Sequence, residues 1–191
     1  MAKGSSEGGI VETIKTVFWA LVIAIGFRSV FFQPFWIPSE SMKDTLLIGD
    51  FIFVNKMAYG YSKYSCPFGI CPISGRLLAS DPQRGDVVVF RHPVSGEEYV
   101  KRLIGLPGDT VQVKGGVLYI NGAEVPQEPD GVFAETYERQ GPQGSYPRCA
   151  NGQPAEGAAC EKRRFRETLP GGRVHDVMNI EDNGAGDDTD V

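Results

Sequence analysis

Residues 84–125 read RGDVVVFRHPVSGEEYVKRLIGLPGDTVQVKGGVLYINGAEV, and this stretch decides the fold. Runs rich in β-branched and aromatic residues are separated by turns containing Gly, Pro, Asn and Asp, which is the pattern of successive short β-strands. Asn121-Gly122, between two alternating runs, is a strong signal for a β-hairpin. The stretch predicts strands at residues 86–90, 99–104, 110–114, 117–120 and 123–125.

The sequence before this stretch extends the β prediction. Pro34 and Pro38 disfavour helix in the residues before them, so residues 33–38 are expected to be extended. Residues 50–56 (DFIFVNK) predict a further strand with apolar side chains on both faces. The 13 prolines and 24 glycines among 191 residues also suit short strands and turns. We therefore expect a mostly β chain with room for one domain of ordinary size.

The charge of the chain argues against a nucleic-acid partner. The net charge is −5, whereas a nucleic-acid binder needs a basic face to offset phosphate charge. Arg148 and the run Lys162-Arg163-Arg164 lie among acidic residues, so we interpret them as solvated surface residues.

The four cysteines form two local pairs, Cys66/Cys71 and Cys149/Cys160. Each pair flanks a loop containing Gly or Pro, so each can close a small disulfide in an oxidising compartment. A zinc site is the alternative, but only His92 and His175 are available to join it and no C-x-x-C or H-x-x-x-H spacing is present. We favour disulfides or unpaired thiols and expect no metal. The sequence leaves the three possible connectivities open.

Residues 16–27 (TVFWALVIAIGF) carry no charge. Residues 10–32 reach the length of a membrane-spanning helix if Lys15 and Arg28 extend their charged ends into water at the two interfaces. A cleaved signal peptide and a buried core helix are the alternatives, but no small-residue cleavage site follows the apolar run. We predict an uncleaved anchor. The positive-inside signal is weak here, and the possible disulfides favour the outer side of the membrane for the rest of the chain.

Two positions stand out as candidates for chemistry. Ser41 lies in a turn-like stretch, IPSESM, just after the apolar segment, and Lys101 lies in the predicted strand at residues 99–104. A serine hydroxyl needs a base within hydrogen-bond reach. His92 and His175 are the only histidines, and neither has a recognisable setting, although a Ser-His-Asp triad stays an alternative.

A lysine can act as the base if its amine is neutral, and burial lowers the pKa of an amine. Strand alternation places Tyr99, Lys101 and Leu103 on one face, with Arg102 on the other. Lys101 can therefore be desolvated between an aromatic and an aliphatic neighbour. On these residues alone, a solvent-facing lysine on an edge strand stays the alternative.

Three motifs resemble the boxes of type I signal peptidases, in the same order and behind a membrane anchor: PSESM at 38–42 continued by TLLIGD at 45–50, RGDVVVF at 84–90, and YVKRLIGLPGD at 99–109. The resemblance implies a bacterial serine endopeptidase that removes N-terminal signal peptides from exported preproteins without a cofactor. It also implies a β-barrel-type catalytic domain like that of self-cleaving repressors. The expected location is the bacterial inner membrane, with one span and the catalytic domain on the extracytoplasmic side.

Position by position, the resemblance makes Ser41 the nucleophile and Lys101 the general base. The Ser41 backbone N–H and the Ser39 hydroxyl would form the oxyanion hole. The signal-peptide region would bind extended, with small residues at the first and third positions before the cut. The pockets for these residues would be lined by Phe35, Ile37, Met42, Leu46, Ile52, Tyr99 and Val100. The expected partners are this preprotein segment and the lipid bilayer.

The chain departs from the family pattern at two places. Glu40 and Asp44 stand where glycine and proline are common. The later box, Gly-Asp-Asn-x-x-Asp-Asn-Ser-like, is absent, and residues 183–188 are only superficially similar, so we expect a C-terminally truncated chain that cleaves slowly. The expected plan is a tail at 1–9, an anchor at 10–32, a catalytic β core at 33–126, an irregular or β insertion with the second cysteine pair at 127–173, and an incomplete C-terminal part at 174–191.

Two other functions fit the same residues. A different Ser/Lys peptidase, such as a self-cleaving repressor or a pilin-maturing peptidase, would share the dyad, although the DNA-binding segment of repressors is missing. A single-pass protein with a non-catalytic extracytoplasmic β module would share only the architecture. Replacing Ser41 or Lys101 distinguishes an enzyme from such a module.

Overall fold

The structure is a computed structural model that describes residues 6–181, 184 and 186–190. The chain divides into two compact units, one of Met1–Phe35 with Ile52–Asp81 and the other of Trp36–Phe51 with Pro82–Val191. Most of the tail expected at 1–9, and part of the acidic segment at 183–188, lie outside the described residues.

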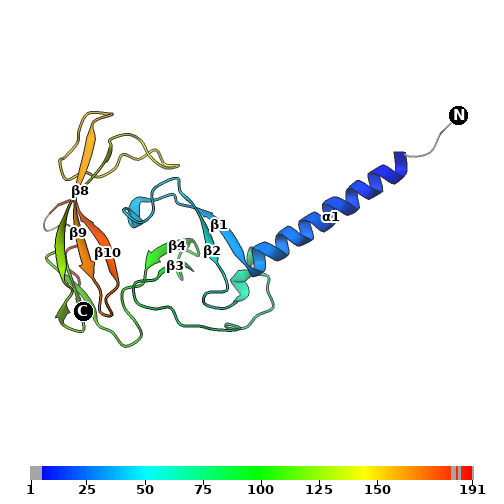
Figure 1. Ribbon diagram of the computed structural model, residues 1–191, viewed down its shortest axis with the longest axis horizontal. Helices are drawn as coiled ribbons and strands as arrows, with labels where there is room; N and C mark the ends of the chain where they lie inside the picture. Colours follow the sequence, from blue (N-terminus) through cyan, green and yellow to red (C-terminus); the bar gives the residue numbers. More distant parts are fainter. Residues whose placement is uncertain (1–5, 182–183, 185, 191) are drawn as a thin grey trace. The chain divides into compact units, whose positions relative to one another are not determined.

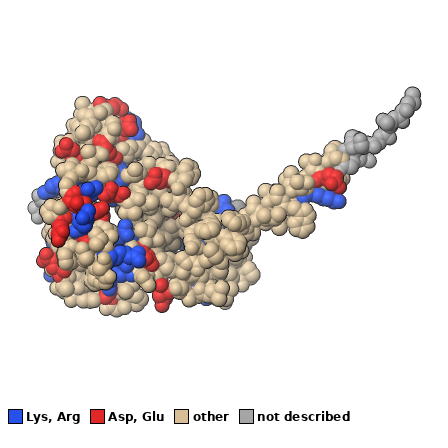
Figure 2. Space-filling model, viewed as in Figure 1, with Lys and Arg blue, Asp and Glu red and all other residues tan. Residues whose placement is uncertain are grey.

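The first unit begins with helix α1 (Ser6–Val30), drawn in blue in Figure 1. Its stretch Gly9–Val30 is the one helix in the described residues that is long and apolar enough to cross a membrane, with a mean hydropathy of 1.9 and no part of it buried. Twenty-two helical residues extend about 33 Å, which matches the hydrocarbon thickness of a bilayer. This exposure argues against the alternative of a buried core helix, because none of the apolar stretch is buried. Figure 2 shows charged atoms gathered near its N-terminal end.

After α1 the chain forms a two-stranded sheet from β1 (Phe32–Trp36) and β2 (Phe51–Asn55), as expected from the prolines and the apolar run. The loop after β2 returns to the end of the helix, where the Tyr61 hydroxyl donates a hydrogen bond to the Val30 carbonyl at 3.0 Å. The loop contains two short 3₁₀ turns and a disulfide between Cys66 and Cys71; the turns are η2 (Lys63–Ser65) and η3 (Pro67–Gly69).

Two sets of antiparallel strands in the second unit follow the predicted meander. The hairpin of β3 (Val87–Arg91) and β4 (Glu98–Arg102) precedes a three-stranded sheet of β5 (Val111–Lys114), β6 (Val117–Ile120) and β7 (Ala123–Glu124). Asn121 and Gly122 both have positive φ, 54° and 78°, as a two-residue hairpin turn requires. The strand predictions in this stretch are confirmed.

A second three-stranded sheet, in the order β10-β9-β8, completes the second unit. It contains β8 (Gln127–Thr136), β9 (Ala159–Thr168) and β10 (Val174–Asn179). The segment 127–173, for which irregular and β structure were both open, therefore holds two ten-residue strands. A disulfide between Cys149 and Cys160 ties the loop before β9 to the start of that strand, so the structure pairs each cysteine with its near neighbour.

The hydrophobic core of the second unit is small. Among the described residues, four buried side chains form it, with Ile104 and Val113 packed against them: Leu118, Ile120, Val125 and Leu169. The prediction of a mostly β chain behind one N-terminal helix is confirmed, but the strands of the described residues form four separate sheets and not a closed barrel. Figure 2 shows acidic and basic atoms interspersed over the face around β8 and β9.

Candidate active site

Ser41 lies in the 3₁₀ turn η1 (Glu40–Met42) of the second unit. On the N-terminal side of the turn, Ile37 is 1% exposed, donates a backbone hydrogen bond to Asp50 and accepts one from Gly49. Within the turn, the Met42 side chain is buried as well. Buried apolar residues on both sides of Ser41 therefore fix the turn, while Ser41 itself is exposed.

Lys101 comes from β4, sixty residues further along the chain, where it lies directly opposite Val88 of β3. Its Nζ atom donates a hydrogen bond to Ser41 Oγ. The half-buried position of the side chain removes water from the amine, and this desolvation lowers the pKa of Lys101 below its ordinary value of 10.5. The structure thus brings together a hydroxyl and an amine whose environment favours the uncharged form.

Ser39 lies next to this pair. Its Oγ is 3.4 Å from Ser41 Oγ, and its backbone is extended, with φ −135° and ψ 155°. Ser39 is the N-cap of η1 but makes no side-chain cap hydrogen bond, and its hydroxyl instead lies within hydrogen-bond distance of the Ser41 hydroxyl. The Ser41 N–H is among the first amides of the helical turn, which have no carbonyl partner within it. Two potential donors therefore lie at the hydroxyl of Ser41.

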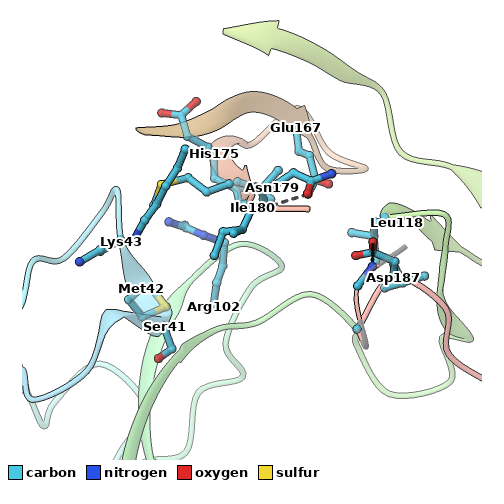
Figure 3. A pocket seen from close by; sticks show the side chains of 18 of the residues that line it. Ser41, Met42, Lys43, Arg102, Leu118, Glu167, His175, Asn179, Ile180 and Asp187 are labelled. Carbon is cyan, nitrogen blue, oxygen red and sulfur yellow. Dashed lines mark hydrogen bonds and ion pairs between the residues drawn. The ribbon is translucent and has the colours of Figure 1, made fainter. Parts of the chain in front are cut away.

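Ser41 and Lys101 border a cavity of about 710 Å³ in the second unit. Figure 3 shows Ser41, Met42 and Lys43 on one wall, and His175, Asn179 and Ile180 on another. Arg102 also lines the cavity and donates hydrogen bonds to the Gly85 carbonyl and to Thr45 Oγ1; the lining therefore draws on η1, β4 and β10.

The substrate-binding residues predicted from the family resemblance are dispersed. Met42 lines the cavity. Ile37 is buried beneath the turn, and Tyr99 stacks on Phe90 with ring centroids 6.2 Å apart. The remaining residues of that set are not among those lining the cavity, and their role stays a prediction: Phe35, Leu46, Ile52 and Val100.

The two histidines have partners other than Ser41. His175 Nε2 is 3.2 Å from Glu167 Oε2, and both side chains are 6% exposed. His92 Nδ1 accepts a hydrogen bond from the Ser95 N–H at 3.1 Å. Within the described residues, neither histidine makes a hydrogen bond to Ser41. The geometry favours the Ser/Lys pair over the Ser-His-Asp alternative.

A group of charged residues beside Ser41 escaped the sequence analysis. Lys162 was interpreted as a solvated surface residue, and this was wrong, because its side chain is 2% exposed and its Nζ is 2.7 Å from Glu135 Oε1. Glu40 and Lys43 join the same group. The sequence signal for it was weak: two opposite charges three residues apart around Ser41, and nothing that linked them to residues about 100 positions away.

The family assignment follows from comparison with known proteins. The sequence profile of a family described as "Signal peptidase, peptidase S26" matches residues 10–178. The chain belongs to the S26 signal peptidase family. The matched region includes most of α1 and both residues of the Ser41–Lys101 contact. The family resemblance inferred from the three motifs is confirmed.

Individual S26 relatives match over most of this chain. Signal peptidase I of Rickettsia akari (strain Hartford) is 35% identical over 182 residues, which make up 92% of this chain and 60% of the relative. Signal peptidase I of Rickettsia canadensis (strain McKiel) is 36% identical over 164 residues, 84% of this chain and 54% of the relative. For Signal peptidase I of Rickettsia typhi (strain ATCC VR-144 / Wilmington) the values are 37% over 171 residues, 86% and 57%. The chain thus spans a little more than half the length of these relatives.

Proposed function

We propose that the chain is a membrane-bound serine endopeptidase that removes N-terminal signal peptides from exported preproteins. The observation that carries this proposal is the hydrogen bond between Lys101 Nζ and Ser41 Oγ, together with membership of the S26 family. Ser41 is the nucleophile and Lys101 the general base.

The proposed reaction begins with a neutral Lys101 amine. With a neutral amine, Ser41 Oγ is the donor of this hydrogen bond and Lys101 Nζ the acceptor. The Ser41 hydroxyl gives its proton to the amine lone pair as Oγ attacks the scissile carbonyl carbon. The Lys101 ammonium then gives this proton to the leaving amine when the C–N bond breaks, which leaves an ester on Ser41. Water attacks the ester with Lys101 again as base, and the proton returns to Ser41 Oγ as the acid product leaves.

The tetrahedral intermediate carries a negative oxygen. We assign its stabilisation to the Ser41 N–H and the Ser39 hydroxyl, which lie beside the reacting Oγ. Loss of one such donor typically lowers kcat about 10²–10³-fold. The Ser39 hydroxyl is the member of this pair that a side-chain substitution can remove.

The lowered pKa of Lys101 supports its role as base. Desolvation is the cause that acts in this direction here. Only the uncharged amine accepts a proton, so the rate is expected to rise with pH through the lowered pKa of Lys101.

We propose that the substrate segment binds in an extended conformation beside β4. In the part of the chain that the structure describes, β4 pairs only with β3, so its second edge has backbone groups free to pair with a peptide. Small side chains at the first and third positions before the cut would place the scissile carbonyl at Ser41.

We further propose that α1 anchors the chain in the bacterial inner membrane as its single span, with the catalytic residues on the extracytoplasmic side. Support for the bilayer comes from the unburied apolar surface of Gly9–Val30. Within the same unit, Phe53, Ile70 and Leu78 are each more than 70% exposed, an apolar surface that suits contact with lipid. Support for the outer side comes from the two disulfides, which persist in oxidising compartments.

The test is cleavage of a preprotein by the full chain reconstituted in lipid vesicles, with the product identified by N-terminal sequencing. The variants Ser41→Ala and Lys101→Met are expected to abolish cleavage, and Ser39→Ala to lower kcat about 10²–10³-fold. Ser80→Ala, at an exposed serine in an irregular segment, is the matched control and is expected to cleave normally. Equal cleavage by all four variants would contradict the proposal and favour the non-catalytic β module.

A further inference from the structure

Two lysines beside the Ser41 turn are buried. The side chains of Lys43 and Lys162 are each 2% exposed. An ammonium group removed from water is tolerated only where anions and hydrogen bonds replace its hydration. The positions of the two lysines therefore require an explanation.

Two carboxylates balance these lysines. Glu135 lies 2.7 Å from Lys43 Nζ and 2.7 Å from Lys162 Nζ. Glu40 Oε2 lies 3.3 Å and 3.1 Å from the same two atoms. We call Glu40, Lys43, Glu135 and Lys162 the four-charge cluster, and its formal charges sum to zero. Gln140 adds a hydrogen bond to Glu135 at 2.9 Å and accepts one from Lys43 at 2.9 Å.

The ionised state of Glu135 is consistent with its surroundings. Burial alone would raise the pKa of Glu135. The hydrogen bonds from Lys162, Lys43 and Gln140 outweigh this effect and hold the pKa of Glu135 below its usual value. The carboxylate thus stays charged at neutral pH, as two adjacent ammonium groups require.

One half of the cluster belongs to the β8–β9 pair. Glu135 of β8 is directly opposite Cys160 of β9, and Lys162 is two residues further along β9. Residues two apart on a strand share a face, so Glu135 and Lys162 are diagonal neighbours on one face of the sheet. The disulfide from Cys149 to Cys160 holds the end of β9 that carries Lys162.

The other half of the cluster flanks the candidate nucleophile. Glu40 and Lys43 are three residues apart, and the Lys43 N–H donates a hydrogen bond to the Glu40 carbonyl at 3.0 Å. In a 3₁₀ turn, residues i and i+3 lie above one another on the same side. Lys43 therefore reaches Glu135 of β8 and Glu40 reaches Lys162 of β9. Ser41, between them in sequence, is left to contact Lys101.

We propose that the four-charge cluster is a positioning device that holds the Ser41 hydroxyl against Lys101, with Glu40 and Lys43 as positioning residues. The proposal deepens the proposed function and rests on it. Catalytic groups have to stay within about 0.5 Å of their productive geometry, and charge-assisted hydrogen bonds on both sides of Ser41 give the turn this rigidity.

Stability alone does not explain the cluster. Replacing a complete buried ion pair by neutral residues of similar size is often neutral for stability, whereas removing one partner is strongly destabilising. A positioning role and a purely stabilising role predict different results when one positive and one negative charge are removed together. If the cluster positions Ser41, this double change restores the stability lost in the single variant but does not restore the placement of Ser41.

The experiment compares Lys162→Met with the double variant Glu40→Gln/Lys162→Met in the full chain in vesicles. The single variant is expected to lower the melting temperature, and the double variant to recover most of that loss. In the double variant kcat for preprotein cleavage is expected to fall 10–100-fold, with KM changed less than about threefold, because misplacement by about 1 Å costs about 10²-fold in rate. Arg166→Met is the matched control, since Arg166 pairs with Asp130 from an exposed position on the same strand.

A second measurement separates this proposal from the proposed function. Hydrogen exchange of the amides at residues 39–46 is expected to be faster in the double variant than in Arg166→Met, whether or not the chain cleaves. A double variant with recovered melting temperature, unchanged exchange and unchanged kcat would overturn the positioning device. If the unaltered chain and Ser41→Ala both fail to cleave, the proposed function is refuted, and the exchange result alone decides whether the cluster holds the turn.

Discussion

Replacing Val88 by Glu is expected to shift the acid limb of the pH–rate profile to higher pH. Val88 and Lys101 are directly opposite in the β3–β4 hairpin, so their side chains share one face with Cβ atoms about 5 Å apart. A carboxylate there stabilises the protonated amine and raises the pKa of Lys101, which is otherwise lowered by desolvation. A larger fraction of Lys101 is then charged and unable to accept the Ser41 proton at any pH on that limb.

The size of the shift follows from the distance. Two unit charges about 5 Å apart interact by about 3 kcal/mol at an effective dielectric constant of about 20, which corresponds to about two pKa units. Lys101 is only half-buried, and solvent screening reduces this value, so we expect a shift of about one unit. The rate on the acid limb should therefore fall about tenfold, while the rate on the plateau at higher pH stays the same.

The assay is cleavage of a preprotein by the vesicle-bound chain across the pH range, with Val88→Gln as the neutral control of equal size. Raising the salt concentration to about 1 M shortens the screening length to about 3 Å and should reduce the difference between the two variants. Acid limbs that coincide for Val88→Glu and Val88→Gln would refute the assignment of this limb to Lys101.

Three further predictions concern the scaffold. Leu169→Ala, in the small core, is expected to lower the free energy of unfolding by about 3 kcal/mol in a denaturant titration, and a loss below about 1 kcal/mol would contradict the core assignment. Replacing Cys149 and Cys160 together by Ser removes a disulfide with a sequence separation of 11 and should cost about 3 kcal/mol in the same measurement; equal stability of both forms under oxidising conditions would argue against the bond. Gly60→Ala would place a Cβ atom 2.3 Å from the Leu77 carbonyl oxygen at a φ of +80°, whereas the Cβ atom of Gly152→Ala, at a φ of +85°, meets nothing within 4 Å. The melting temperature should therefore fall further for Gly60→Ala than for Gly152→Ala. Equal decreases would disprove the steric conflict at Gly60.

Turn chemistry and periodicity made much of the fold predictable. Asn121-Gly122 and the apolar runs around it located the meander, because each strand there has its own hydrophobic signal. Strand β9 has no such signal. Its buried positions include Cys160, Lys162 and Glu167, so the alternation between inside and outside is not an alternation between apolar and polar residues.

The candidate site also contains residues that could be predicted from the sequence and residues that could not. Ser41 and Lys101 were predicted because each lies in a motif, and the structure brings them within hydrogen-bond reach. The four-charge cluster joins residues from η1, β8 and β9 that are distant in the sequence. Charged residues in a chain are ordinarily expected at the surface, and only the folded structure shows that Lys43 and Lys162 are buried.

The short connection between α1 and η1 has a kinetic consequence. Helix α1 ends at Val30 and η1 begins at Glu40, so the intervening backbone spans at most about 36 Å. For a chain anchored as proposed, the enzyme and a membrane-inserted substrate meet by lateral diffusion in the same bilayer. The concentration that sets their encounter rate is then the number of molecules per unit area of membrane. Diluting vesicles in buffer should leave the turnover rate unchanged, whereas adding empty lipid that fuses with them should lower it.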